Sequence, residues 1–269
     1  MLKRLPHSDA LVVYVDFAAL RGAGVLDMLD NPKIAQEPEY QDFVRKIDFH
    51  YKQDLDSAMV AFAPTGKFLL VRGQFDWKSL RSFVESENGH CYDSLCRMQG
   101  STPQRRISFF PLHSRLMALA VSEDESAALR MQDLAAGPEL EVPDAPVWMA
   151  VPASVLKSGE GLPAGTRPFA RSLERAESVL ISFVPEGKRL AAKLNVRCRN
   201  SQDAVELVSQ LSRITTLLRE MIQRENHKPN AADLSGVLTS GSFRNDGARV
   251  FGYWPIERVF VENMLGGQS

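Results

Sequence analysis

The sequence predicts an α+β fold built from two tandem similar repeats, each in the order β-α-β-β-α-β-β-α with largely antiparallel sheets. A short motif occurs twice, as FAPTGK at residues 62–67 and as FVPEGK at residues 183–188. In both places an apolar strand-like stretch precedes the motif, another follows it, and an amphipathic helical pattern comes next. Because hairpins join strands in antiparallel pairs, these observations favour an α+β fold over a doubly wound parallel one.

The repeated motif is interpreted as a hairpin turn, in which proline fixes φ and glycine takes a conformation that other residues avoid. Its Gly-Lys ending also raises the possibility of a phosphate-binding loop, which requires the pattern G-x-x-x-x-G-K-[ST]. Ala61 stands where the first glycine belongs, and Phe68 stands where the hydroxyl belongs. A strand rather than a helix is expected to follow, so no helix dipole would favour phosphate. The motif therefore predicts structure and not nucleotide binding.

The first repeat is expected to span residues 1–135. Gly-rich and polar breaks separate its apolar stretches, and Asp76 is a predicted helix N-cap. The expected elements are a strand at 12–16, a helix at 38–47, a hairpin of 59–63 and 68–73, a helix at 77–85, strands around 95–98, 107–112 and 116–121, and a helix at 123–134.

A linker is expected at residues 136–146, where prolines and a glycine cluster. The second repeat then covers residues 147–269. Asn200 is predicted to cap its long helix, and Asn-Asp-Gly at 245–247 is a strong hairpin signal. The expected elements are a strand from 147, an exposed loop at 157–170, strands at 178–184 and 190–197, a helix at 201–224, a hairpin within 242–254, and a helix at 256–265.

Composition excludes several functions. The formal net charge of −1 gives no basic excess, so we expect no nucleic-acid partner. No apolar run approaches the roughly 20 residues that cross a bilayer, so we expect no transmembrane segment. No preset histidine or cysteine spacing predicts a zinc site, and we expect no cofactor.

The three cysteines are Cys91, Cys96 and Cys198. A small, odd number argues against a disulfide framework. Cys91 and Cys96 flank a short loop and can pair, but a disulfide needs a Cα separation that the sequence does not give. The pairing is therefore left open.

Asp54 and Asp56 form the main candidate for chemistry. In an extended chain both carboxylates would point to the same face, where they could bind a divalent cation through oxygen, with His50 nearby. The alternative is a polar entry into a strand. A second candidate is aromatic: if Phe251, Tyr253 and Trp254 are exposed, the last hairpin is an interaction surface. For Trp254 we favour burial in the core.

Part of the chain resembles a group of uncharacterised bacterial proteins that are typically exported or membrane-anchored. The resemblance lies in the stretches LPHSDALVVYVDFAALRG, EYQDFVRKIDFHYKQDLDSAMVA and LLVRGQFDWKSL, and covers mainly residues 5–125. It is carried by Asp16, Leu20, Arg21, Tyr40, Phe43, Asp54, Asp56, Gly73 and Phe75. It implies work outside the cytoplasm, exported or periplasmic, with a targeting segment removed. The alternative is a cytoplasmic protein. The resemblance implies no activity and no catalytic residues.

The leading hypothesis is a non-catalytic binding or structural module of the bacterial cell envelope, because neither repeat carries matched catalytic groups. Its partner would be an unknown protein or small molecule, and oligomerisation is left open. The alternative is a metal-dependent or hydrolytic enzyme with a site between the two repeats, near Asp54, Asp56 and His50. An enzyme would need a polar cleft with convergent titratable groups.

Overall fold

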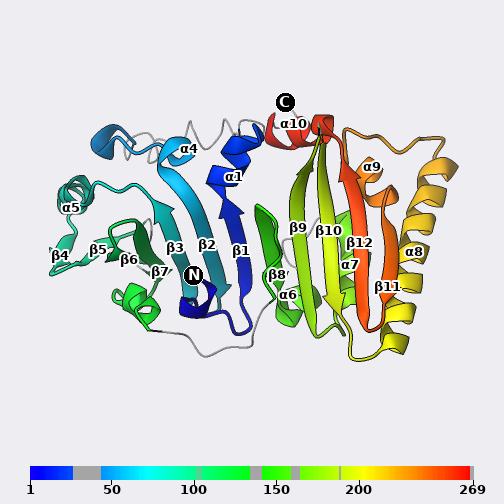
Figure 1. Cartoon of the computed structure of the whole chain (residues 1–269), viewed down its shortest axis with the longest axis horizontal. Coiled ribbons are helices and arrows are strands. Elements are labelled where there is room, and N and C mark those ends of the chain that lie inside the picture. The colour runs from blue at the N-terminus through cyan, green and yellow to red at the C-terminus, as the bar shows by residue number, and fades with distance from the viewer. Residues whose placement is uncertain are drawn as a thin grey trace. The chain divides into compact units, whose positions relative to one another are not determined.

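The computed structural model describes residues 1–26, 44–100, 102, 104–133, 141–158, 164–187 and 189–266. The chain divides into two compact units, with the boundary between Val142 and Pro143. We call the described residues before this boundary unit 1 and those after it unit 2. Figure 1 shows their elements, and each unit is described by itself.

Unit 1 is built on an antiparallel sheet with the strand order β1-β2-β3-β7-β6-β5-β4. Its strands are β1 (Leu11–Asp16), β2 (Leu55–Ala63), β3 (Gly66–Gly73), β4 (His90–Tyr92), β5 (Leu95–Gln99), β6 (Arg106–His113) and β7 (Leu116–Ser122). Its helices are η1 (Leu2–Arg4), α1 (Phe17–Gly22), α4 (Tyr51–Asp54), α5 (Trp77–Ser86) and η3 (Ala127–Met131).

The central strands of unit 1 are covered on both faces. On one face, Leu80 and Val84 of α5 join a core cluster with Phe109 and Met117. The 3₁₀-helix η3 packs against β6 and β7, and fully buried Ala128 donates its backbone N–H to the Ser108 hydroxyl at 3.1 Å. Along each strand neighbouring side chains point to opposite faces, so β6 supplies Phe109 to one cover and Ser108 to the other.

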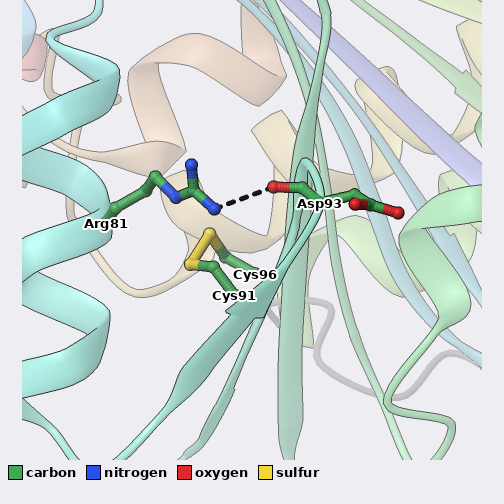
Figure 2. Close-up of a disulfide and its surroundings, with 4 residues drawn as sticks. All are labelled: Arg81, Cys91, Asp93 and Cys96. Carbon is green, nitrogen blue, oxygen red and sulfur yellow. Dashed lines mark hydrogen bonds between the residues drawn. A yellow bond between two sulfur atoms is a disulfide. The ribbon is translucent and has the colours of Figure 1, made fainter.

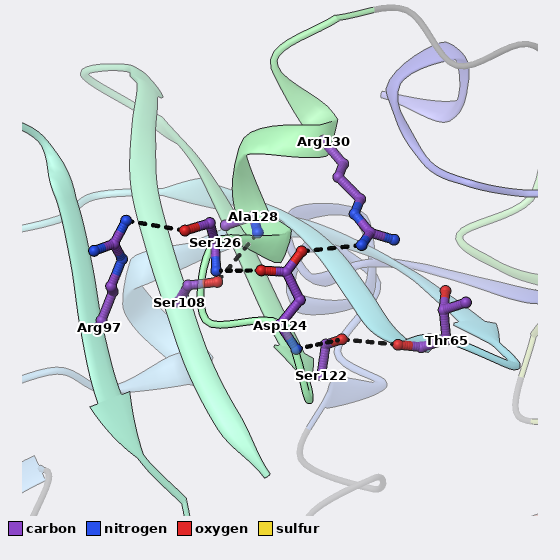
Figure 3. A network of polar contacts seen from close by, with 8 residues as sticks. All are labelled: Thr65, Arg97, Ser108, Ser122, Asp124, Ser126, Ala128 and Arg130. Carbon is purple, nitrogen blue, oxygen red and sulfur yellow. Dashed lines mark hydrogen bonds and ion pairs between the residues drawn. The ribbon is translucent and has the colours of Figure 1, made fainter. Parts of the chain in front are cut away.

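A polar network holds η3 in place (Figure 3). Asp124 accepts hydrogen bonds from the Ser126 backbone N–H and from Arg130, both at 2.9 Å. These donors favour the ionised carboxylate, and they lower the pKa of Asp124. Arg97 from β5 donates to the Ser126 hydroxyl at 2.9 Å. The segment after β7 is therefore fixed against the sheet by polar contacts as well as by burial.

Unit 2 has an antiparallel sheet with the strand order β8-β9-β10-β12-β11. Its strands are β8 (Val147–Val151), β9 (Ser178–Glu186), β10 (Arg189–Arg197), β11 (Ser242–Asp246) and β12 (Arg249–Ile256). Its helices are α6 (Ala153–Ser158), η4 (Ala164–Thr166), α7 (Arg167–Leu173), α8 (Ser201–Arg224), α9 (Leu234–Thr239) and α10 (Arg258–Gly266).

The main core cluster of unit 2 lies on the face of its sheet that α7 and α8 cover, while Trp148, which is opposite Ser182 in the register, is buried on the other face. Alternate residues of the strands, such as Val196 and Val250, pack in one cluster with Phe169 of α7 and Leu211 of α8. The apolar stripe of α8 recurs at helical spacing, and the Asn200 side chain caps the helix by accepting from the Asp203 N–H at 2.8 Å. Figure 1 shows α6 and α7 behind the strands, and it shows no described helix in front of β9, β10 and β12.

The α+β class and the antiparallel pairing are confirmed. The scheme of two tandem similar repeats is not confirmed. After the shared hairpin and helix, unit 1 continues with four strands, β4 to β7, whereas unit 2 continues with α9 and the two strands β11 and β12. The expected linker at 136–146 lies partly outside the described residues. Its residues 141–146 form neither helix nor strand.

Several expected elements need correction. The helix expected at 123–134 is the short 3₁₀-helix η3, and the loop expected at 157–170 contains the start of α7 at Arg167. Strand β4 and helix α9 were not expected at all. The helix expected at 38–47 lies mostly outside the described residues, where only 44–47 are described, as helix. The helix at 201–224 and the N-caps Asp76 and Asn200 are confirmed.

Candidate functional site

The structure does not bring Asp54, Asp56 and His50 together as a set of metal ligands. Asp54 is the last residue of α4, and its carboxylate accepts the His50 backbone N–H at 2.6 Å. Asp56 lies in β2 and forms an ion pair with Arg115 at 2.8 Å. The His50 ring faces Asp48, with Nε2 3.5 Å from the carboxylate. Each group therefore serves a local contact of its own.

The physical reason is the backbone around Leu55. The expectation that Asp54 and Asp56 share a face assumed a continuous strand, but β2 begins only at Leu55 and its pairing with β3 shifts register between Leu55 and Ser57. Among the residues that the structure describes, no group of three or more His, Cys, Asp or Glu side chains could hold a metal ion.

The pairing of Cys91 with Cys96, which the sequence left open, is present as a disulfide (Figure 2). The two residues face each other in the register of β4 and β5, and their Cα atoms are 4.0 Å apart. Arg81 of α5 donates to the Asp93 carbonyl in the turn of this hairpin at 2.8 Å. Cys198 is a buried free thiol in unit 2, and burial raises the pKa of that thiol.

The open face of the unit 2 sheet carries a hollow of about 660 Å³. Strand alternation explains its walls, since β9, β10 and β12 point every second side chain away from the core. Register then places Lys193 opposite both Ser182 and Tyr253, and Asn195 opposite both Leu180 and Phe251. The full lining is Pro143, Asp144, Leu180, Ser182, Val184, Lys193, Leu194, Asn195, Ser242, Phe243, Arg244, Phe251, Gly252 and Tyr253.

Near one end of the hollow lies a hydrogen-bonded set of charged groups around Tyr253. The Tyr253 hydroxyl donates to the Glu186 carboxylate at 2.8 Å, and Lys193 forms an ion pair with the same carboxylate at 3.1 Å. Arg189 donates to the Tyr253 oxygen at 3.1 Å. The hydrogen bond lowers the pKa of Glu186 and raises the pKa of Tyr253, because it is strongest when the acid is ionised and the phenol is neutral.

Arg244 and Phe251 form the second feature of the hollow. They are opposite each other in the pairing of β11 with β12, and the Arg244 guanidinium lies over the Phe251 ring, 4.6 Å from its centroid. Within the described part of the chain, no carboxylate forms an ion pair with Arg244. The guanidinium is exposed on its strand, so its N–H groups can reach a ligand.

Trp254 points the other way from Phe251 and Tyr253. It packs in the core against Phe169 and Phe243, with ring centroids 6.3 Å and 5.2 Å away. Its indole N–H has no hydrogen-bond partner in the described residues, and Gly241 leaves the space that the ring needs, since a Cβ there would lie 2.5 Å from Nε1. The three aromatic candidates therefore divide, with two on the hollow and one in the core.

Sequence reasoning found Phe251 and Tyr253 but missed Lys193 and Arg244. The missing signal is the cross-strand register, which brings both cations beside the aromatic rings. The alternation within SVLISFVPE indicates a two-sided strand at β9. It does not indicate which face a helix covers.

The comparisons with known proteins give a fold and no activity. No protein-family model matches the sequence, and no curated protein matches it. Crystal structures of TP0453 are similar: crystal form IV has a TM-score of 0.52 at 10% identity, covering 99% of this chain and 96% of that one. Crystal form I has a TM-score of 0.52 at 12% identity, covering 97% and 96%. At such identities the similarity concerns the fold alone.

Proposed function

We propose that this protein is a non-catalytic binding module of the bacterial cell envelope, and that it binds a small molecule in the hollow on the open face of unit 2. The observation that carries the proposal is the hollow itself. Its volume of about 660 Å³ lies within the range of small-molecule sites, roughly 300–1,000 Å³.

The chemistry of the lining supports binding without reaction. Leu180, Val184 and the rings of Phe251 and Tyr253 supply apolar surface, while Ser182 and Asn195 supply a few polar groups that could orient a ligand. Glu186, whose pKa is lowered, stays ionised at neutral pH and is occupied by Tyr253 and Lys193. Such a carboxylate is a poor general acid or base near neutrality.

The location in the envelope is supported by the disulfide between Cys91 and Cys96. Disulfides persist in oxidising compartments such as the periplasm and are rare in the cytoplasm. The resemblance of residues 5–125 to exported proteins points the same way. No helix in the described ranges is both long and apolar enough to cross a membrane.

The enzymatic alternative gains no support from the contacts of Asp54, Asp56 and His50, each of which is engaged separately. A binding role is the simpler use of the geometry. Such a ligand would lie against β9, β10 and β12 on the face that bears the exposed Lys193.

The proposal is tested by filling the hollow. Nile red, an uncharged dye that fluoresces in apolar surroundings, is titrated into the full chain with its disulfide intact. We expect saturable fluorescence with the wild type and loss of most of it with Ser182→Trp, because the half-buried Ser182 lies on the floor of the hollow.

The matched control is Ser212→Trp, which places the same side chain on an exposed position of α8. It should bind the dye as the wild type does. Equal saturable fluorescence in both variants would show that the dye binds elsewhere and would contradict the proposal. Circular dichroism and thermal midpoints of all three proteins check that each is folded.

A further inference from the structure

We infer that the ligand of the hollow is a small organic anion with an apolar body, whose anionic head is bound by Arg244. This inference rests on the proposed function, and it adds the charge and the polarity of the ligand. Its basis is the different environment of the two cations that line the hollow, Lys193 and Arg244.

Lys193 is already neutralised. Its ammonium pairs with the Glu186 carboxylate at 3.1 Å, and the same carboxylate is held by the Tyr253 hydroxyl at 2.8 Å. An incoming anion would have to compete with Glu186 for this ammonium. Lys193 therefore contributes its aliphatic stem to the wall more than a free positive charge.

The positive charge of Arg244 remains available to a ligand. Its described contact is with the face of the Phe251 ring, 4.6 Å from the centroid. A guanidinium on an aromatic face is oriented by the ring quadrupole while its N–H groups remain at its edge. These donors match the two oxygens of a carboxylate or two oxygens of a phosphate, which is the geometry in which arginine binds anions best.

The one carboxylate of the lining, Asp144, belongs to a segment at the opposite edge of the unit 2 sheet from Arg244. It precedes β8, whereas Arg244 belongs to β11, and β8 and β11 are the outer strands in the order of unit 2. An amphipathic anion can therefore place its head at β11 and direct its apolar body over Phe251 toward Leu180 and Val184. The charge pattern favours this orientation over the reverse one.

The experiment is isothermal titration calorimetry of the full chain, disulfide intact, with four ligands that share an eight-carbon chain. Octanoate and octyl phosphate are anionic, octanamide is neutral and octylamine is cationic. We expect both anions to bind about tenfold or more tightly than octanamide, as for a charge-assisted hydrogen-bonded pair. Either order of the two anions supports the inference, and the order identifies the preferred head group.

The variant Arg244→Gln should weaken both anions about tenfold and leave octanamide nearly unchanged. Arg244→Lys retains the charge but loses the planar donor pair, and we expect it to fall between the two. Arg213→Gln is the matched control, because Arg213 is an exposed arginine on α8, away from the lining. It should bind every ligand as the wild type does.

Two kinds of result would overturn the inference and leave the binding role in place. In one, octanamide binds as tightly as octanoate, or Arg244→Gln binds octanoate like the wild type. In the other, octylamine binds most tightly, which would assign the head to Asp144. If none of the four ligands binds the wild type, the anion inference is wrong, and the dye titration with Ser182→Trp decides the proposed function separately.

Discussion

Units 1 and 2 share a hairpin followed by a helix, but they differ in how the second face of the sheet is covered. Each has a β-hairpin followed by an amphipathic helix, β2-β3-α5 in one and β9-β10-α8 in the other. In unit 1, η3 adds a second cover, so Ala118 and Ala120 of β7 are 0% exposed. In unit 2 the corresponding face bears the exposed Lys193 and Arg244 and the hollow. Under the proposed function, the hollow of unit 2 is the ligand site, while η3 occupies the equivalent face of unit 1.

The largest effect expected from this comparison concerns α8, the long helix that packs in the main core cluster of unit 2. Leu211→Ala should lower the free energy of unfolding of unit 2 by about 3 kcal/mol, because Leu211 is 0% exposed and its loss leaves a cavity. Hydrogen-exchange mass spectrometry of β10 and β12 would measure the change. Leu217→Ala, at a 46% exposed position of the same helix, should cost less than about 0.5 kcal/mol.

A result in which both leucine variants lose equal stability would contradict the view that one face of α8 builds the core. Peptides from β6 and β7 serve as an internal reference. If these are destabilised by Leu211→Ala as strongly as β10, the two units do not unfold independently, and the comparison loses its basis.

An effect of intermediate size is expected from removing the disulfide. Among the described residues, only unit 1 contains one. The double variant Cys91→Ala/Cys96→Ala should lower the stability of unit 1 by about 2 kcal/mol, since the bond closes a short loop in the unfolded chain. Urea unfolding followed by hydrogen-exchange mass spectrometry measures the stability of each unit separately. The wild type in reducing buffer should match the variant, and unit 2 should be unchanged in both samples.

The smallest expected effect is a pH-dependent loss of protection at η3, the second cover of unit 1. The pKa of Asp124 is lowered in the folded protein, so its stabilising effect is complete above the unfolded-state value, near 4, and is lost as pH falls through the folded-state value. Unit 1 should therefore lose protection at η3 on acidification, and Asp124→Asn should lose less over the same pH range. Hydrogen exchange at stepped pH measures this.

The control for the pH series is Asp246→Asn, on the exposed outer strand β11 of unit 2. It should leave the pH response of η3 unaltered. A slope for Asp124→Asn as steep as that of the wild type would show that the contacts of Asp124 with Ser126 and Arg130 do not hold this cover.

Local patterns were enough to predict much of the fold. The turn glycines Gly66 and Gly187 do take positive φ, and α8 begins and ends at the predicted residues. The error at 123–134 has a tertiary cause, because this segment packs as a 3₁₀-helix against β6 and β7 and donates a backbone N–H to Ser108. Periodicity within one segment carries no information about such a distant partner.

The candidate site was predictable only in its aromatic part. Phe251 and Tyr253 stand out in the sequence, but the position of Arg244 over the Phe251 ring depends on the register of β11 against β12. The separation of Asp54 from Asp56 depends on the end of α4 and the irregular start of β2. Both are properties of pairing between segments, which a single sequence does not specify.

The position of the disulfide at the end of the unit 1 sheet has a consequence for solubility. Strand β4 is outermost in that unit's order and only three residues long. An outer strand that frays exposes backbone groups which can pair with another chain and start aggregation. The disulfide between Cys91 of β4 and Cys96 of β5 holds the outer strand against its neighbour. Because the link is covalent, it protects this edge from such pairing for as long as the bond stays oxidised.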